Sequence, residues 1–496
     1  MSTDGGSAPG VARARIAALL FVLTWLSGAW FGCDALNPNN ATRMFAAISL
    51  VEDHDATIDD YAALTIDKAE FGGHTYMDKA PGMTLMAVPV VAATNWLTGT
   101  DARQERILIP ALGAERLMRP RVRLAAALTS ALLTAVAATM LFGMTATLTG
   151  SLGAGLFASL GYAFGTPIWG WSTTIFGHAA AAALLLIATI SIWRGTRERP
   201  DAAAALVAGL AIGWAIVVEY QAALTGFAIG LWALWRLWRH PPAARWRPML
   251  LASAGGIVAL VPLAIYNLIA FGTLFKLGYE GVVGFDGMHQ GLFGLTYPKP
   301  DVVGQILWGA DKGLIWVAPI LLVAPIGLAL LIRRRETRDL GLLALAAAVI
   351  VVLINASYVY WNGGSSTGPR LSVPAIGFLA LGLGPVWTWC RRRMLKAALA
   401  ALLALSMALN LIIAAVDVTS PEGIAWPVWT WIITKRLARG ALRDFPAEHW
   451  GWSPWAGFAL YVVIALVFLG AMLATLRRAS IPPHPRPPRG DGRTAA

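Results

Sequence analysis

The sequence predicts an all-α polytopic membrane protein, a bundle of about 12 transmembrane helices with a long first outer loop. Of its 496 residues, 57% are hydrophobic and only 13% are charged, which is about half the charged share of a soluble protein. A soluble domain cannot bury so much apolar surface, because even a large core leaves a polar skin outside. This composition excludes a secreted enzyme, a DNA-binding domain and a disordered scaffold.

Each predicted helix is an apolar stretch, and crossing a bilayer takes about 20 such residues. The candidate stretches are 16–33, 123–142, 151–169, 179–193, 201–218, 222–237, 249–270, 314–332, 339–358, 371–389, 395–416 and 455–475. A further stretch, 82–99, is apolar but is interrupted by Pro89 and Asn95. Its place in the bundle therefore depends on the orientation of the others.

Basic clusters between the stretches predict this orientation, because loops rich in Arg and Lys face the cytoplasm. The clusters lie at 194–199, 236–247, 333–338, 391–396 and 477–478, and Arg13 and Arg15 precede the first stretch. Both termini are then cytoplasmic, and 34–122 lies outside with an even number of crossings. The charged segment 105–117 cannot pair with 82–99 as a second span. We therefore expect 82–99 to lie along the outer interface.

The resulting organisation has six parts, and the net charge of +12 orients the chain rather than predicting a nucleic-acid partner. The parts are a cytoplasmic N-terminus (1–15), a first transmembrane helix (16–33), an outer loop with interfacial helices and the candidate active site (34–122), a transmembrane core with outer loop 271–313 (123–390), C-terminal helices with outer loop 417–454 (391–478) and a Pro-rich, disordered cytoplasmic tail (479–496).

The first outer loop collects acidic side chains. Nine of the 27 acidic residues of the chain lie between Asp34 and Asp78. A solvated acidic surface explains Asp53, Asp55 and Asp60 as well as a functional site does. The segment DKAEFGGHTYMDKAPG (67–82) is different, because it holds two Asp-Lys pairs and a Gly-Gly turn before the stretch 82–99. We expect Asp78 and Lys79 to lie in the first turn of the helix that this stretch forms. A carboxylate and an ammonium group at the membrane surface suit a substrate that carries a phosphate and a hydroxyl.

Other polar motifs precede helices at the predicted outer face. WNGGSSTGPR (361–370) leads into the stretch 371–389, and exposed backbone N–H groups together with Arg370 suit an anion. A Gly-rich turn whose Arg reaches the lipid headgroups is the alternative. His178, the pair Glu219-Tyr220 and Lys312 occupy similar positions. Taken singly, each of these residues is typical of a side chain that only stabilises the fold. Because they all lie at the same predicted face, we expect them to line a single polar cavity there.

Several motifs are absent from the sequence. It contains no Walker loop, no GxGxxG after a strand, no HExxH and no CxxC pair, so ATP-driven transport, dinucleotide chemistry and a Cys/His zinc site have no support. No cofactor is predicted. A divalent metal could bridge acidic residues and a phosphate, but no ligand set in the sequence is strong enough to claim one.

Taken together, NNATR (39–43), SLVED (49–53), GGHTYMDKAPG (72–82), FGH (176–178), EY (219–220) and WNGGSSTGPR (361–370) resemble the GT-C superfamily of membrane glycosyltransferases. The resemblance covers the chain to about residue 390. It is strongest to the dolichyl-phosphate-mannose protein mannosyltransferases and to the aminoarabinose transferase of lipid A. It implies a polyprenyl-phosphate-sugar donor, a periplasmic acceptor that is a glycolipid, glycan or protein, and inverting transfer. It also implies a first-loop carboxylate base and a place in the bacterial inner membrane.

The site residues follow from this resemblance and from one departure. The position that matches the family's catalytic Asp is Asn40, and an amide cannot accept a proton as a base. The predicted catalytic residues are therefore Asp78, Asp67 and Asp59, with Asp34 as a further candidate. The predicted substrate-binding residues are Arg43, Asn40, Lys79, His178, Glu219, Tyr220, Lys312 and Arg370. Lys79, Arg370 and Arg43 would hold the lipid phosphate. We favour Asp78 or Asp67 as the base, because an adjacent Lys would keep either ionised.

Two other functions stay open on the sequence alone. A transporter or flippase of a lipid-linked or anionic substrate also fits twelve spans, but such proteins usually hold their charged sites near the midplane of the bilayer. A non-catalytic assembly protein of envelope biosynthesis is the other possibility, because Asn40 stands where the family has its catalytic Asp. The gathering of charges in the outer loops favours chemistry at the membrane surface.

Overall fold

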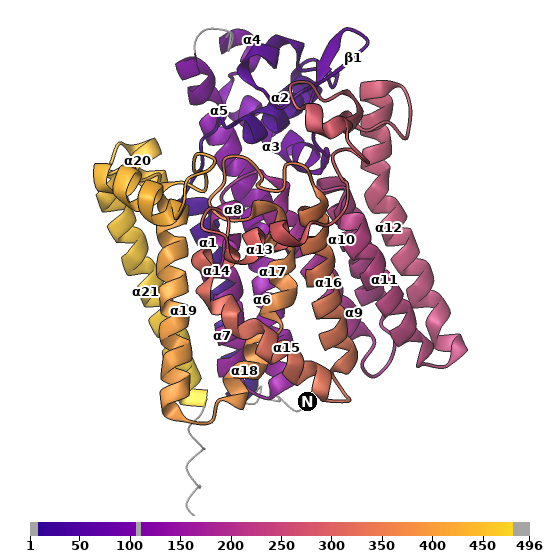
Figure 1. Ribbon diagram of the computed structural model, residues 1–496, viewed down its shortest axis with the longest axis vertical. Coiled ribbons are helices and arrows are strands. Elements are labelled where there is room, and N and C mark those ends of the chain that lie inside the picture. The colour runs from indigo at the N-terminus through magenta and orange to yellow at the C-terminus, as the bar shows by residue number, and fades with distance from the viewer. Residues whose placement is uncertain (1–7, 106–110, 480–496) are drawn as a thin grey trace, which may run out of the picture.

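The computed structural model describes residues 8–105 and 111–479, and these fold almost entirely into helices (Figure 1). Seven helices are long and apolar enough to cross a membrane, and an eighth span results if the bent pair Arg370–Ala380 and Leu383–Trp389 counts as one. The chain is therefore a helical, multi-pass membrane protein, as predicted.

The long helices run side by side along the longest axis of the molecule (Figure 1). They are α1 (Ala8–Trp30), α5 (Ala111–Ala126) continued by η2 (Ala127–Ala131) and α6 (Leu132–Thr149), α7 (Leu152–Phe164), α9 (Gly177–Gly195), α10 (Ala202–Val218), α11 (Ala222–Trp238), α12 (Pro242–Phe271), η5 (Pro319–Val323) continued by α15 (Ala324–Arg333), α16 (Arg338–Ser357), α17 (Val373–Ala380), α18 (Leu383–Trp389), α19 (Arg393–Val416) and α21 (Pro454–Ala479). Every predicted stretch contains one of these apolar helices. Several of them are shorter than 18 residues, so the count of twelve spans stays a prediction.

Shorter elements connect the bundle helices. They are α2 (Pro38–Glu52), η1 (Asp59–Leu64), the antiparallel strands β1 (Ala69–Phe71) and β2 (His74–Tyr76), α3 (Gly82–Thr98), α4 (Ala102–Glu105), α8 (Ile168–Ser172), η3 (Gly278–Gly281), η4 (Asp286–His289), α13 (Pro300–Trp308), α14 (Leu314–Val317), η6 (Arg370–Ser372), η7 (Val428–Arg436), η8 (Leu437–Arg439) and α20 (Phe445–Trp450). Helices α2, α3 and α4 and the β-hairpin gather at one end of the bundle (Figure 1). The segment predicted to form the first outer loop thus folds into a layer of short elements, and its position outside the membrane stays a prediction.

Helix α3 is the apolar stretch predicted not to cross the bilayer. It packs against α2 at the end of the bundle, and its first residue, Gly82, meets the last turn of α10 (Figure 1). A Cβ atom at Gly82 would lie only 2.6 Å from the backbone nitrogen of Val218, so this contact requires glycine. The placement of α3 at the membrane interface stays a prediction.

The start of α3 corrects one expectation. We expected Asp78 and Lys79 in the first turn of this helix, but the helix begins at Gly82 with Pro81 as its N-cap. Proline disfavours helical backbone in the residue before it, so Asp78 and Lys79 lie in the preceding loop. There they are free to turn toward α2.

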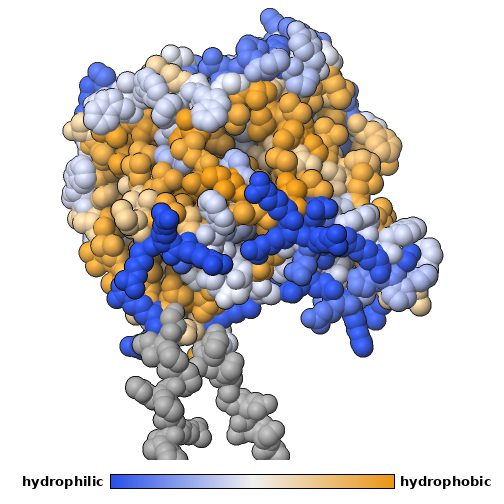
Figure 2. Space-filling model, turned by 60° about the horizontal axis from the view of Figure 1, so that its bottom comes forward, coloured by the Kyte–Doolittle hydropathy of each residue, from blue (hydrophilic) through white to orange (hydrophobic). Residues whose placement is uncertain are grey.

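The opposite end of the bundle carries basic side chains. Helix α1 begins there and α21 ends there (Figure 1). Viewed from that end, an apolar surface gives way to strongly hydrophilic residues (Figure 2). A buried ion pair of 2.6 Å between Arg236 and Asp339 joins the ends of α11 and α16. The assignment of this end to the cytoplasm stays a prediction, and all of the expected tail except Ala479 lies outside the described residues.

The orientation can be tested with single cysteines on exposed residues at the two ends, in a chain whose Cys33 and Cys390 are replaced by alanine. We expect a membrane-impermeant maleimide to label Asp60→Cys in intact spheroplasts and to label Glu336→Cys only after the membrane is opened, because Asp60 lies in the first outer loop and Glu336 in a basic loop. Labelling of Glu336→Cys in sealed spheroplasts would contradict the orientation.

Candidate functional site

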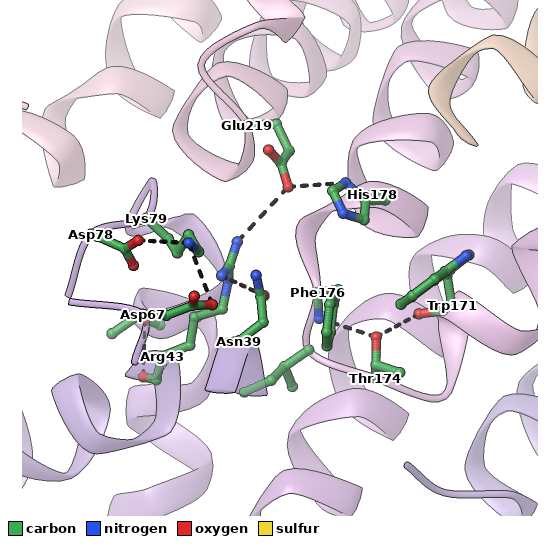
Figure 3. Close-up of polar contacts among 12 residues, drawn as sticks. Asn39, Arg43, Asp67, Asp78, Lys79, Trp171, Thr174, Phe176, His178 and Glu219 are labelled. Carbon is green, nitrogen blue, oxygen red and sulfur yellow. Dashed lines mark hydrogen bonds and ion pairs between the residues drawn. The ribbon is translucent and has the colours of Figure 1, made fainter. Parts of the chain in front are cut away.

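Arg43 lies at the centre of a buried polar cluster (Figure 3). It projects from α2, whose start is fixed by Pro38 and by the side chain of Asn37, which accepts a hydrogen bond from the backbone N–H of Asn39. The Arg43 guanidinium donates to Asn39 Oδ1 over 2.7 Å, and its backbone oxygen accepts a hydrogen bond from Thr84 of α3. Helix α2 therefore holds the guanidinium through Asn39, and α3 is bonded to the backbone of the same arginine.

The loop before α3 adds a second cation with two carboxylates. Lys79 Nζ lies 2.6 Å from Asp78 Oδ2 and 3.4 Å from Asp67 Oδ2. One lysine thus serves both carboxylates, whereas the sequence had paired each Asp with its own neighbour. Lys68 instead donates to the backbone oxygen of Ala62. The Asp78 side chain is only 3% exposed, and burial raises its pKa despite the attraction of Lys79. Lys79 therefore opposes the effect of burial on Asp78 without cancelling it, and the role of Lys79 in keeping Asp78 ionised stays a prediction.

Glu219 and His178 complete the cluster from the bundle. Glu219 follows the last residue of α10, and His178 is the second residue of α9. Glu219 Oε1 lies 3.4 Å from His178 Nδ1 and 3.8 Å from Arg43 Nη2 (Figure 3). Burial raises the pKa of Glu219, although Arg43, Arg370 and Lys79 oppose this rise. The carboxylate therefore joins the bundle to the layer formed by the first outer loop.

Helix α9 approaches this carboxylate through a glycine. A Cβ atom at Gly177 would lie 2.2 Å from Glu219 Oε1, so no other residue fits without moving the carboxylate. Helix α9 also begins without a side-chain cap, which leaves its first N–H groups and the positive end of its dipole facing this region.

Arg370 enters the same region from η6, as the motif 361–370 predicts. Its guanidinium stacks 5.2 Å from the ring centroid of Phe176, the residue just before α9. Gly363 has a φ of +67°, and a Cβ atom there would lie 2.9 Å from Arg370 Cγ, so the turn packs directly on the arginine stem. In the described part of the chain, no carboxylate lies within ion-pair distance of this guanidinium.

Several buried atoms of the cluster have no hydrogen-bond partner among the described residues. They are Arg43 Nε, Asp78 Oδ1, His178 Nδ1, Glu219 Oε1 and Arg370 Nε. Leaving a buried polar group unpaired costs about 1–3 kcal/mol. So many unpaired donors and acceptors in one place are typical of a site that a polar ligand completes.

A narrow crevice leads from Glu219 into the bundle between α9, α11, α16 and α17. Its other lining residues are almost all apolar: Ala181, Leu185, Gln221, Ala222, Thr225, Val351, Ile354, Leu371 and Pro374. Glu219 and Gln221 form its polar end. The arrangement joins a charged cluster to an apolar path, as an amphiphilic ligand would require.

Three other predicted residues occupy different surroundings. Lys312 is buried and donates to the backbone oxygens of Gly364 and Ser366, so it braces the 361–370 turn. Asn40 donates to the backbone oxygen of Asp34 and accepts from the N–H of Ile175, which ties α2 to the segment before α9. Tyr220 packs edge-on against Tyr279 at a centroid distance of 5.4 Å.

Asp59 is the one predicted catalytic residue that the structure does not bring to the cluster. It lies in η1, where its carboxylate is 2.7 Å from His74 Nδ1 and accepts a hydrogen bond from the N–H of Thr75. Burial acts to raise the pKa of Asp59, but these contacts outweigh it and lower the pKa. Both side chains of the pair are exposed, so Asp59 fastens the β-hairpin at the surface.

Sequence reasoning missed two residues of the site. Asn39 holds the Arg43 guanidinium from one helical turn away, and that i, i+4 spacing is the signal that could have found it. Tyr279 of η3 lies near Glu219 and Asp78, and the neighbouring Gly278 packs so closely on the loop before α3 that a Cβ atom there would lie 2.8 Å from the Met77 backbone oxygen. No local pattern links residue 279 to residue 78. For metals, the described residues contain no group of three or more His, Cys, Asp and Glu side chains arranged to hold an ion.

Comparisons with known proteins show a likeness to solved structures but not to any known sequence family. No family model and no curated protein matches the chain. Among solved structures, the crystal structure of ArnT from Cupriavidus metallidurans bound to undecaprenyl phosphate is similar over 94% of this chain and 76% of that one, with 15% sequence identity and a TM-score of 0.46. A likeness at this level assigns no function, so the chemistry must come from the side chains.

The glycine that admits Glu219 gives a direct test of the site geometry. We expect Gly177→Ala to destabilise the folded protein by about 1–3 kcal/mol, the usual cost of overpacking, because the new methyl group collides with a buried carboxylate. Unfolding in mixed micelles would measure this loss. Gly230→Ala in α11 is the matched control, since nothing lies within 4 Å of a Cβ atom there. Equal stability of the two variants would contradict the geometry.

Proposed function

We propose that the protein is a membrane glycosyltransferase that moves a sugar from a polyprenyl-phosphate carrier to an acceptor on the outer face of the bacterial inner membrane. One observation carries the proposal. Arg43, Lys79 and Arg370 come from three separate segments and gather around Glu219, the buried carboxylate at the polar end of an apolar crevice. Arg43 and Lys79 pair with carboxylates, and Arg370 has none within ion-pair distance among the described residues. The proposal agrees with the resemblance of the outer-loop motifs to GT-C enzymes.

The cations suit the phosphate of the donor. When the bond between the sugar and the phosphate breaks, negative charge develops on the leaving phosphate, and fixed donors in a site with little water stabilise it. Arginine matches phosphate geometry well. Arg43 and Arg370 each have a buried Nε without a partner in the described structure, so both have a donor free for the ligand.

The crevice suits the start of the lipid chain. Ligand sites are typically apolar with a few polar groups that fix orientation, and here the polar groups lie at one end only. The crevice is narrow, so α11 and α16 have to separate to admit an isoprenoid chain. Their inner ends are held together by the buried pair Arg236–Asp339.

The reaction also needs a base for the acceptor hydroxyl. The candidates are the three carboxylates of the cluster, Asp67, Asp78 and Glu219, of which the two aspartates lie beside Lys79. In inverting transfer, the acceptor oxygen attacks the anomeric carbon from the face opposite the phosphate. The base takes the hydroxyl proton as the bond to the phosphate breaks.

The position of the cluster favours transfer over transport. Secondary transporters hold substrate near the middle of the bilayer, commonly where helices are broken. Here Glu219 lies just beyond α10, His178 lies in the first turn of α9, and Arg43 and Lys79 come from the layer at the end of the bundle (Figures 1 and 3). A site at this depth is reached by a donor in the outer leaflet and by an acceptor outside the membrane.

Removing single cations tests the phosphate site. We expect Lys79→Ala and Arg370→Ala each to weaken binding of undecaprenyl phosphate to the purified protein at least tenfold, because each removes a charge-assisted contact worth about 1.5–3 kcal/mol. Both should also lower sugar transfer. Binding would be measured by native mass spectrometry or by the shift in melting temperature.

Arg334→Ala is the matched control for these variants, since Arg334 is exposed in a basic loop at the far end of the bundle. It should bind the lipid as the unaltered protein does. Full binding and full transfer in both Lys79→Ala and Arg370→Ala would rule out the proposed phosphate site.

A further inference from the structure

The carboxylates of the cluster are not equivalent in their access to a ligand. Of Asp67, Asp78 and Glu219, only Glu219 lines the crevice. Asp78 is almost fully buried and lies 2.6 Å from Lys79, while Asp67 faces the same lysine from the other side. The two aspartates therefore neutralise and position Lys79. Glu219 has no lysine partner at such a distance, and its arginine contact is longer.

Glu219 has a carboxylate oxygen that is free to accept a hydrogen bond from a substrate hydroxyl. Its Oε1 and the Nδ1 of His178 are 3.4 Å apart, and neither atom has a hydrogen-bond partner among the residues described. A hydroxyl that approaches the pair from one side would be within reach of both atoms. The Glu219 carboxylate occupies the space that a side chain at position 177 would fill. Its contact with Arg43 places it beside the proposed phosphate site.

The residue at the position expected for a base cannot take this role. Asn40 is an amide, and its side chain is already bonded to the backbone of Asp34 and Ile175. Its contact with Ile175 lies three residues before His178 in the chain. Asn40 therefore helps to position the start of α9, which carries the histidine.

Resting on the proposed transfer reaction, we propose that Glu219, which lies beside His178, is its general base. The proton of the acceptor O–H passes to Glu219 while the acceptor oxygen bonds to the anomeric carbon. The bond from that carbon to the phosphate oxygen breaks, and its electron pair leaves with the phosphate, which Arg43, Lys79 and Arg370 hold. The proton on Glu219 is then lost to water after product release.

The pH dependence of this step has a definite sign. Burial raises the pKa of Glu219, and the groups that face it are Arg43 from α2, Lys79 from the loop before α3, His178 from α9, Tyr279 from η3 and Arg370 from η6. Because the base acts when deprotonated, transfer should rise with pH through the pKa of Glu219 and then level off. We call the fall in transfer rate at low pH the acid limb of the profile. A variant without the Glu219 carboxyl should lose this acid limb.

The test compares Glu219→Gln, Glu219→Asp, Asp67→Asn and Asp78→Asn in the full chain in lipid nanodiscs. The donors are radiolabelled hexoses and pentoses linked to undecaprenyl phosphate, and envelope extract supplies the acceptors. Binding of undecaprenyl phosphate is measured separately. Glu336→Gln, an exposed carboxyl at the far end of the bundle, is the matched control.

We expect Glu219→Gln to bind undecaprenyl phosphate within about threefold of the unaltered chain and to lose transfer by about 10²–10⁴-fold, the usual effect of removing a general base. Its residual transfer should lack the acid limb. Glu219→Asp should keep the limb at a reduced rate, because its carboxylate lies one methylene further away. This variant also separates loss of the base from loss of the fold.

For Asp67→Asn and Asp78→Asn, we expect weaker lipid binding, because they disturb Lys79, and an acid limb that persists. If Glu219→Gln transfers at the full rate while Asp67→Asn or Asp78→Asn loses transfer without losing binding, a first-loop residue is the base and the assignment of Glu219 is overturned. If the unaltered chain neither binds undecaprenyl phosphate nor transfers any of the sugars, the proposed function fails and this inference fails with it.

Discussion

The contact between Arg43 and Glu219 joins two parts of the chain that are separate in sequence and differ in character. Arg43 belongs to the layer of short elements after the first helix, and Glu219 belongs to a turn between two apolar helices. An isolated charge in such surroundings is costly, and each partner offsets the burial of the other. The close contact at Gly82 serves the same junction, because it brings α3 of the layer against α10 of the bundle. The close contact at Gly177 lies within the bundle and packs α9 against Glu219.

The layer and the bundle contribute different chemistry at this junction. The layer supplies two cations and two aspartates, which hold one another close to neutrality. The bundle supplies an apolar crevice, the uncapped start of α9, one glutamate and one histidine. An amphiphilic phosphate needs both contributions together. The unpaired buried atoms at the junction indicate that the protein retains polar groups there at some cost to its own stability.

Local properties of the sequence predicted the architecture, and long-range contacts fixed the site. Hydrophobicity and basic loops can be recognised in each short stretch of sequence by itself, so they predicted an all-α membrane bundle. They also predicted that the polar motifs gather at the outer end, including those that carry Arg43, Lys79, His178, Glu219 and Arg370. The partners of these residues depend on packing. The single lysine shared by Asp67 and Asp78, the bracing role of Lys312 and the approach of Tyr279 arise from contacts between distant segments. Helix α3 begins only after Pro81, so Asp78 and Lys79 lie in the loop before it and not in its first turn, where we had expected them.

The central claim is that a lipid phosphate binds where the layer meets the bundle, and an experimental structure of the protein in nanodiscs with undecaprenyl phosphate tests it most directly. We predict that the phosphate oxygens lie within hydrogen-bond distance of Arg43, Lys79 and Arg370. The first isoprene units should follow the crevice between α11 and α16. A phosphate bound at the opposite, Arg-rich end of the bundle, or on its outer surface away from Glu219, would contradict the account.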